Sequence, residues 1–356
     1  MALQADQIQD LITVTLKDLG RLKFVELAST LQEYHALGKL IDQYKVQYQS
    51  GTAIQWNIML NQSGAAKNVG LFESDNVNIS DVMTTASIPW RHCTTNYAFE
   101  RREVQFNATP ARIVELVKIR RTDAMISLAE LMEKNFWQAP PTTSDTTHPY
   151  GLAYQIVRGQ ADEEGFLGKR PYAQDGTQFS DHSGLDPDLS ANAQWRNYFA
   201  DYSEVNKTDL VRKWRKASVF TNFKPVPQVA VNDYNTGNNY AYYTNYNVIG
   251  RLEEALEAQN DNLGNDIASK DGQLVFRQVP VMWVPHLETD TTNGTDPIYG
   301  VNWGTLKPVF LSGEYMREEG PTQVPGQHTT MQVFVDSTLN FKCTDRRRNF
   351  LLSKVS

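Results

Sequence analysis

The sequence predicts an α+β fold, in which helices and strands occupy separate stretches of the chain instead of alternating strictly. Three observations support this prediction. Two strand-like runs flank a long polar segment between residues 51 and 106, a long helix that starts at a proline follows them, and the final third is rich in β-forming residues separated by turns. The 356 residues, 40% hydrophobic and 21% charged, suit a globular protein with one large domain or two ordinary ones.

The composition also argues against several classes of protein. No stretch approaches the run of about eighteen apolar residues that spans a membrane. The opening MALQADQIQD has no basic segment before an apolar core, so we expect no secretory signal. Cys93 and Cys343 form neither a metal pattern nor a disulfide framework, and both are expected as reduced thiols. The net charge of -7 argues against nucleic-acid binding by the whole chain, because affinity for phosphates depends on accumulated cations.

The first part of the chain predicts an amphipathic segment followed by a β-hairpin arm. Residues 1–50 have helical character, with apolar residues at three-residue intervals: Leu16, Leu19, Leu22 and Val25. The run Ala53–Leu60 alternates, which places Ile54, Trp56, Ile58 and Leu60 on one face. The second run, Ala86–Phe106, is less regular and carries Ile88, Trp90, Tyr97, Phe99, Val104 and Phe106. Because a two-stranded ribbon buries too little surface to be stable alone, we expect the arm to need a neighbour, often another chain.

The helix expected from Thr109 to Trp137 is the best-defined element of the sequence. Thr109 suits the N-cap, Pro110 suits the first helical position, and Pro140–Pro141 ends the helix. Its apolar stripe is formed by Ile113, Leu116, Val117, Ala124, Leu128 and Leu131. Arg120 and Arg121 interrupt the stripe and are expected to reach its edges. At 1.5 Å per residue the helix would span about 40 Å, which is long enough for a strut across a whole subunit.

The remaining elements follow from local patterns. Residues 142–195 are loop-like, and the part near 160–195 is expected as an exposed insertion. Two helices are predicted over Lys207–Phe220, with Thr208 as its cap, and over Asn245–Asn260. The stretch Asp233–Asn247 is expected as loop with short strands. Further strands are predicted at three places in the final third: Leu274–Pro285, Pro308–Leu311 and Met331–Phe341.

This order of elements resembles the major capsid proteins of tailed bacteriophages, which share the Hong Kong 97-like fold. Three local segments carry the resemblance. Ile126–Trp137 (ISLAELMEKNFW) is similar to the end of the family's spine helix, and His148–Leu152 (HPYGL) is similar to the turn behind that helix. Leu274–Val281 (LVFRQVPV) is similar to the strand by which the chain re-enters the peripheral domain. The resemblance covers roughly residues 50–350.

The resemblance implies a division of the chain into named parts. Residues 1–50 would form an N-terminal arm, and residues 51–106 an extended loop that reaches over a neighbouring subunit. Residues 107–148 would supply the spine helix and the first part of the peripheral domain. Residues 149–274 would form the axial domain, with the insertion near 160–195, which has no obvious counterpart in the family. Residues 275–356 would complete the peripheral domain.

The resemblance also implies a function and partners. Subunits of this family form hexamers and pentamers of an icosahedral shell around packaged double-stranded DNA, so the expected location is the phage head, assembled in the cytoplasm of the host bacterium. Few residues precede the arm, so a separate scaffold protein is expected, together with a portal. The resemblance also allows a cement protein and weak, nonspecific contact with packaged DNA. No membrane is expected.

Several residues are candidates for contacts between subunits. On the arm these are Trp56, Lys67, Phe72 and Trp90, with the aromatic pair Trp56 and Trp90 equally suited to the core of the subunit. Elsewhere they are Arg120, Arg121, Arg346, Arg347 and Arg348. Some members of the family cross-link a lysine to an asparagine, but no partner for Lys67 is identified, and a solvated lysine is the preferred interpretation. A basic cluster could face DNA, form ion pairs between subunits, or lie solvated on a helix: Lys207, Arg212, Lys213, Arg215 and Lys216.

The sequence lacks the common motifs of catalysis and cofactor binding. The sequence has no phosphate-binding G-x-x-x-x-G-K-[ST] loop, no G-x-G-x-x-G after a strand and no G-x-S-x-G elbow. Its six histidines form no H-x-x-x-H pair. We therefore predict a structural subunit with no catalytic residues, no metal and no cofactor. Two alternatives remain open at this point: a virion or surface protein that binds glycans through its Tyr- and Asn-rich loops, and a hydrolase built from loop carboxylates.

Overall fold

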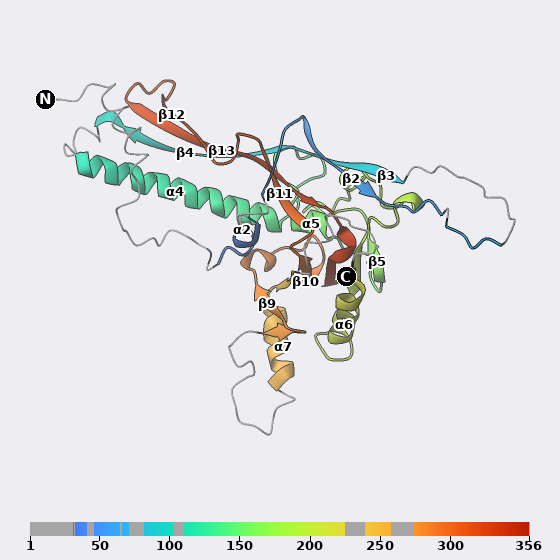
Figure 1. Ribbon diagram of the computed structural model, residues 1–356. Helices are drawn as coiled ribbons and strands as arrows, with labels where there is room; N and C mark the ends of the chain where they lie inside the picture. The colour runs from blue at the N-terminus through green and yellow to red at the C-terminus, as the bar shows by residue number, and fades with distance from the viewer. Residues whose placement is uncertain are drawn as a thin grey trace.

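The computed structural model describes residue 31 and residues 33–40, 46–64, 66–70, 82–102, 110–224, 239–257 and 274–355. Within these residues the fold is α+β, as predicted, and consists of two large sheets, one long helix and a separate β-ribbon (Figure 1). The long helix and the ribbon extend from the body in opposite directions. The predicted N-terminal helical residues from Leu16 to Val25 lie outside the described residues.

A five-stranded sheet supports the long helix. Its strands are β1 (Gln47–Gln49), β4 (Arg91–Glu100), β11 (Leu306–Leu311), β12 (Arg317–Gln323) and β13 (Thr330–Cys343). The order is β1-β11-β13-β12. Strand β4 pairs antiparallel with β13, from Thr330↔Glu100 to Leu339↔Arg91, on the edge of β13 opposite β12. The predicted strands at 308–311 and 331–341 are confirmed as β11 and β13.

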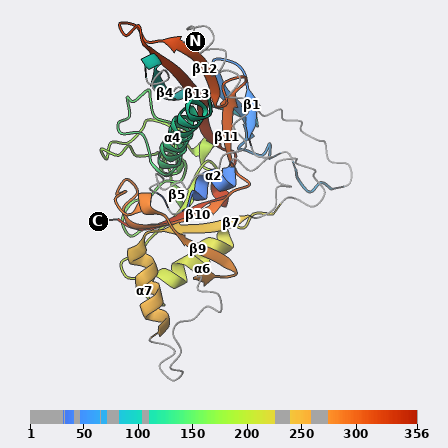
Figure 2. The ribbon, with the colours of Figure 1, turned by 90° about the vertical axis from the view of Figure 1, so that its left-hand side faces the viewer.

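The predicted strut is confirmed as α4 (Pro110–Trp137), a helix of 28 residues that runs beside β4 and β13 (Figures 1 and 2). Its buried side chains recur at seven- and four-residue steps, as expected for one face of a helix: Val117, Ala124, Leu128, Met132 and Phe136. They share one core cluster with Tyr97 and Phe99 of β4 and Val333 and Val335 of β13. Leu131, predicted on the same stripe, is instead 39% exposed, because at 3.6 residues per turn it points about 100° away from the neighbouring buried Met132. Thr109 and the side chains of Ile113 and Leu116 lie outside the described residues.

The predicted hairpin arm is present as β2 (Ala53–Met59) and β3 (Met83–Pro89), an antiparallel two-stranded sheet. The alternation in β2 is confirmed, since Ile54 and Leu60 are buried while Gln55, Asn57 and Met59 are exposed. The second predicted run divides at Pro89: residues before it pair with β2, and residues from Arg91 onward pair with β13. Proline has no N–H to donate, so a change of partner strand at this position sacrifices no ladder hydrogen bond.

The second large sheet has seven strands in the order β5-β6-β14-β10-β7-β9-β8. The first three in sequence are β5 (Glu164–Gly168), β6 (Asn197–Asp201) and β7 (Tyr240–Thr244). The others are β8 (Val275–Phe276), β9 (Val279–Trp283), β10 (Thr295–Asn302) and β14 (Phe350–Lys354). Strand β14 is the last in sequence yet lies between β6 and β10, parallel to the first and antiparallel to the second.

Two helices cover this sheet at the bottom of Figure 1, α6 (Leu210–Phe220) and α7 (Tyr246–Glu257). Leu210, Trp214 and Ala217 of α6 pack into a second core cluster with Val248 and Leu252 of α7. Both predicted helices are present, but the cap of α6 is Asp209. Thr208 does not cap it, because its hydroxyl donates to Asn206 Oδ1 at 3.1 Å.

The predicted strand Leu274–Pro285 is a hairpin. Arg277 and Gln278 both have positive φ, 52° and 66°, and this turn separates β8 from β9. Pro285 then begins a single 3₁₀ turn (Pro285–Leu287). The other short elements are α2 (His35–Leu40), α5 (Leu152–Gln155), η1 (Ser190–Asn192) and η4 (Arg346–Arg348).

Strands from residues 275–356 enter both sheets, so residue 274 does not separate the sheets from each other. The segment near 160–195, which was expected as an exposed insertion, is exposed only in part, because Ala173, His182 and Trp195 are at most 2% exposed. After β5, which belongs to the seven-stranded sheet, the segment consists mainly of turns held by side chains, and this explains its lack of periodicity. Within it Asp175 accepts a hydrogen bond from Thr177 N, and Arg170 forms an ion pair with Asp186 at 2.8 Å.

No helix among the described residues is both long enough and apolar enough to cross a membrane.

Candidate functional site

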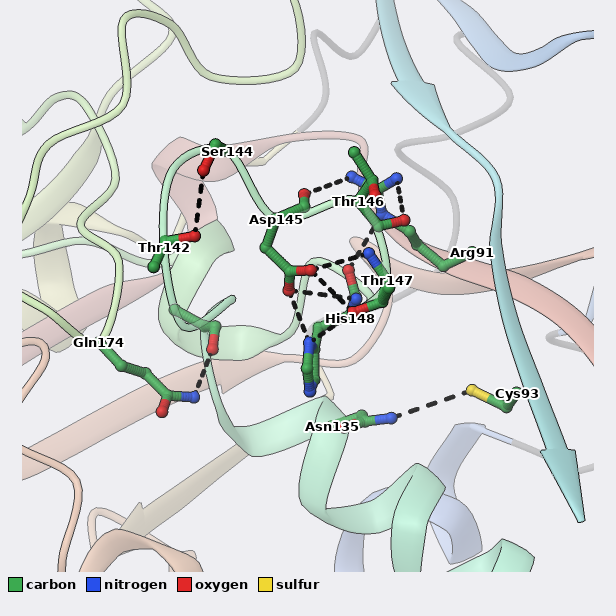
Figure 3. Close-up of polar contacts among 11 residues, drawn as sticks. Arg91, Cys93, Asn135, Thr142, Ser144, Asp145, Thr146, Thr147, His148 and Gln174 are labelled. Atoms are coloured by element: carbon green, nitrogen blue, oxygen red, sulfur yellow. Dashed lines mark hydrogen bonds and ion pairs between the residues drawn. The ribbon is translucent and has the colours of Figure 1, made fainter.

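The base of the ribbon is tied to the end of α4 by one arginine (Figure 3). Arg91 is the first residue of β4, and its guanidinium is buried, with 7% of the residue exposed. It donates from Nε to the carbonyl of His148 at 3.1 Å, and from its two terminal nitrogens to the carbonyls of Thr146 at 2.6 Å and Asp145 at 3.1 Å. These three carbonyls belong to the loop that follows the helix. Arg91 therefore fixes the point where the chain leaves the ribbon and enters the five-stranded sheet.

The loop itself is closed by the carboxylate of Asp145. This carboxylate accepts hydrogen bonds from Thr147 N at 2.9 Å and Thr147 Oγ1 at 2.7 Å, and it lies 2.6 Å from His148 Nδ1. Burial raises the pKa of Asp145, but the hydrogen bonds from Thr147 and His148 outweigh it and lower the pKa to about 2. The carboxylate is therefore ionised at neutral pH and holds the carbonyls in place for Arg91.

A buried glutamate on the spine helix binds the N-terminal segment. Glu133 is 1% exposed, and its carboxylate accepts from Ala36 N and Leu37 N at 2.9 Å and from Trp137 Nε1 at 2.8 Å. Ala36 and Leu37 belong to α2, which precedes the ribbon by more than ten residues in sequence. Glu133 thus joins the start of the described chain to the C-terminal part of α4.

Of the three consecutive arginines, two lie in the interior of the chain. Arg346 is fully buried and donates to the carbonyls of Gln155, Lys169 and Trp195 and to Asn197 Oδ1, all at 2.9–3.1 Å. Burial lowers the pKa of Arg346 to about 10. Arg348 is 3% exposed. The prediction that Arg346 and Arg348 contact other subunits is therefore corrected: successive side chains of a tight turn point in different directions, and these two point inward.

The third arginine and the arginine pair of α4 also make contacts within the chain. Arg347 lies 3.4 Å from Asp345 and over the ring of Phe223. Arg120 donates to the carbonyl of Ala98 at 2.8 Å, and Arg121 forms an ion pair with Glu318 of β12 at 2.6 Å. The pair reaches the edges of the helix as predicted, and what it meets there is the sheet of its own subunit.

The predicted arm residues have different environments. Trp56 is half-buried between two apolar clusters, with Lys342 Nζ 5.8 Å from its ring. Trp90 is also half-buried, and its indole N–H donates to the carbonyl of Gly51 at 2.9 Å. Lys67 lies exposed beyond the end of β2, and Phe72 lies outside the described residues. Both tryptophans therefore pack within the subunit.

The basic cluster divides into two groups. Lys213 forms an ion pair with Asp209 at 2.6 Å, and Lys216 with Glu164 at 2.9 Å. Lys207, Arg212 and Arg215 are exposed. The first two cations thus have acidic partners in their own chain. Arg212 and Arg215 lie on α6, at the bottom of Figure 1, and Lys207 lies shortly before this helix.

Sequence reasoning missed Arg91 and Glu133. Arg91 stands in a strand-like run with no pattern to mark it as buried, and Glu133 sits among charged residues at a helix end, where a solvated side chain is the default. The signal that could have pointed to Glu133 is the close spacing to Trp137, four residues on, which suits a side-chain contact along a helix.

Comparison with known proteins gives matches by structure alone. No family model matches the sequence, and no curated protein matches it either. Among solved structures, a chain of the cyanophage A-1(L) capsid has a TM-score of 0.56 at 15% identity, over 96% of this chain and 99% of that one. A capsid chain of a native GTA particle has a TM-score of 0.55 at 11% identity, over 94% and 95% of the two chains. A chain from Gordonia phage Cozz has a TM-score of 0.50 at 11% identity, over 94% and 90%.

These matches define the class of fold. The chain has the Hong Kong 97-like fold of phage capsid subunits, as its sequence predicted, and the likeness extends over most of the chain. The likeness does not favour the glycan-binding or hydrolase alternatives.

Proposed function

We propose that the chain is the major capsid protein of a tailed bacteriophage, a structural subunit that assembles into hexamers and pentamers of an icosahedral head around double-stranded DNA. The observation that carries the proposal is the extent of the structural likeness. It covers 96% of this chain and 99% of the cyanophage A-1(L) chain, so little of either is left to perform a different task. The proposed role is structural and involves no catalysis.

Each part of the fold has a role in this proposal. The five-stranded sheet with α4 serves as the peripheral domain, and the seven-stranded sheet with α6 and α7 serves as the axial domain, whose tip lies near the symmetry axes. In this proposal the two domains are divided according to the two sheets, and not at residue 274 as expected from the sequence. The ribbon serves as the extended loop that overlaps a neighbouring copy.

The surface of the ribbon supports its role in assembly. Met59 and Met83 face each other across the end of the ribbon farthest from β4, and they are 66% and 58% exposed. Large exposed apolar side chains in one place favour burial against a partner. Each contact can be modest, because a closed shell multiplies the contacts that every subunit makes.

The proposal includes partners beyond a second copy of the chain. A separate scaffold protein and a portal would direct assembly in the host cytoplasm, and a cement protein could bind the finished head. The exposed Lys207, Arg212 and Arg215 suit weak, nonspecific contact with packaged DNA or ion pairs with a neighbouring subunit.

Electron microscopy of the purified chain in negative stain, combined with sedimentation velocity, tests the proposal. The expected result is rings, sheets or closed shells of very high mass. If the chain sediments as a 40.4 kDa monomer, the measurement is repeated after co-expression with the neighbouring genes of its source genome, which would supply a scaffold. A monomer under both conditions would overturn the proposal.

A further inference from the structure

The ribbon has a built-in seat within its own subunit. Its inner face, with Trp56 and Ile58 on β2, Leu60 directly after it and Ala86 on β3, packs on Leu185 and Trp195. Two hydrogen bonds join the same parts, from Ser87 N to the carbonyl of Ser183 and from Asn61 Nδ2 to the carbonyl of Ala191, both at 2.9 Å. We call residues 182–195 the seat loop. It belongs to the segment near 160–195 that was expected to be an exposed insertion.

The seat loop is shaped to meet the ribbon. Ser183 and Gly184 have positive φ, 56° and 78°, and His182 and Leu185 exchange both backbone hydrogen bonds across this turn. The turn directs the carbonyl of Ser183 toward Ser87. Below it the indole N–H of Trp195 donates to His182 Nδ1 at 3.1 Å. The rings of His182 and Tyr154 stack with centroids 5.0 Å apart, which gives the turn a rigid floor.

Arg346 is one of the side chains that connect the seat loop to the rest of the molecule. Arg346 donates at 2.9 Å to the carbonyl of Trp195, the last residue of the seat loop, and at 3.1 Å and 3.0 Å to the carbonyls of Gln155 and Lys169, which both precede the seat loop in sequence. Arg346 itself stands in the turn between β13 of one sheet and β14 of the other. The chain of contacts therefore runs from the ribbon, through the seat loop, to the crossover between the two sheets.

We infer that Arg346 is the positioning residue of the ribbon: through the seat loop it sets the direction in which the ribbon leaves the subunit. The inference rests on the proposed function, in which the ribbon overlaps a second copy of the chain. Only arginine offers a planar fork of donors that reaches four acceptors from a buried site, and lysine offers a single point charge.

The test measures the direction of the ribbon in the full-length subunit, without assembly. Spin labels are placed at two exposed positions, one on the ribbon by Met59→Cys and one on α4 by Asp123→Cys. The native Cys93 and Cys343 are buried. We expect a single narrow distance distribution in the parent, and a broad or displaced one in Arg346→Lys. The control is Arg212→Lys, the same change at an exposed position of α6 outside the seat loop, for which the parent distribution is expected.

A second variant guards against loss of folding. If Arg346→Lys loses its circular dichroism signal, the pair Leu185→Ala and Asn61→Ala replaces it, because these side chains join the seat loop to the ribbon and leave Arg346 intact. This pair is also expected to broaden the distribution. A parent-like distribution in a folded Arg346→Lys, or in the pair if it is used, would overturn the inference. If the distribution is parent-like and the chain still forms shells, the inference about Arg346 fails and the proposed function stands. If the distribution broadens in a chain that never assembles, the inference stands and the proposed function fails.

Discussion

Three charged side chains in the interior bind the main chain of distant segments. Arg91, Glu133 and Arg346 direct most of their hydrogen bonds to backbone groups, so each buried charge is compensated without a buried ion pair. The segments they join are far apart in sequence, such as residues 36 and 133 or 195 and 346. Local sequence patterns therefore could not reveal these contacts between distant segments. The run Arg346–Arg348 shows this clearly, since the sequence displays three equivalent cations and only the fold distinguishes their environments.

Removing the carboxylate of Glu133 should release α2. In Glu133→Ala, Ala36 N, Leu37 N and the indole of Trp137 lose their acceptor, and unsatisfied buried donors cost roughly 1–3 kcal/mol each. We expect an overall loss of about 3 kcal/mol in the free energy of unfolding, measured by chemical denaturation, with faster hydrogen exchange at residues 35–40.

Two further variants test the assignment to Glu133. Glu133→Gln retains one oxygen and should lose less stability than Glu133→Ala. Asp123→Ala, at an exposed position of the same helix, should change stability little. Equal losses of stability in Glu133→Ala and Asp123→Ala would contradict the role of Glu133 in holding α2.

His182 should make stability depend on pH. Burial and then the charge of Arg346 hold the pKa of His182 well below 6.5 in the folded chain, while the unfolded chain keeps the ordinary value. The stabilising contribution is therefore complete above about pH 6.5 and is lost as the pH falls, at up to about 1.4 kcal/mol per pH unit.

Denaturation at pH 7.5 and pH 5.5 measures this dependence. The parent should lose about 1 kcal/mol more than His182→Gln over this interval, because the glutamine does not titrate. The comparison between the two chains cancels the contributions of other groups, among them His286, whose pKa burial also lowers. The same loss in both chains would assign the pH dependence elsewhere.

At the scale of the elements, the sequence predicted what depends on local spacing. The spine helix follows from its proline start and its apolar period, and the ribbon follows from the alternation in Ala53–Met59. The division at Pro89 could not be predicted, because it depends on which strand is available as a partner on each side of this residue. The same holds for the stripe of α4, where Leu128 and Leu131 look equivalent in sequence and the sheet buries only one of them.

Leu128 and Leu131 form a matched pair for mutation. Leu128 is 1% exposed in the core cluster beneath the sheet, so Leu128→Ala should lower the free energy of unfolding by roughly 2–5 kcal/mol through lost burial and a cavity. Leu131→Ala, at a position 39% exposed, should cost less than about 1 kcal/mol. Thermal and chemical denaturation measure both, and similar losses would contradict the packing of α4.

Deletion of residues 61–81 should separate folding from assembly. The deletion leaves β2 and β3 and their apolar contacts with Leu185 and Trp195 in place, so we expect a folded subunit by circular dichroism. Because the deleted residues connect β2 to β3 and belong to the proposed extended loop, shells counted by electron microscopy should become rare. Normal assembly of a folded deletion variant would refute the assignment of the arm.

At the scale of the whole molecule, the class of fold could be predicted and the arrangement of sheets could not. The order of hairpin, long helix and closing strands was sufficient for the class. The place of β14 between β6 and β10 depends on pairings with strands about 150 and about 50 residues earlier, for which a single sequence holds no local signal. The burial of part of the segment near 160–195 was missed for a related reason, since the ribbon and Arg346, which contact it, are distant in sequence.

The late position of β13 and β14 has a consequence for synthesis on the ribosome. Strand β4 must wait for residues 330–339 before it can pair, and the seven-stranded sheet stays open at its middle until residues 350–354 emerge. Neither sheet can close in a chain that stops early. A prematurely terminated polypeptide therefore has no completed surface to offer to its neighbours, and it is excluded from any larger structure that full-length copies build.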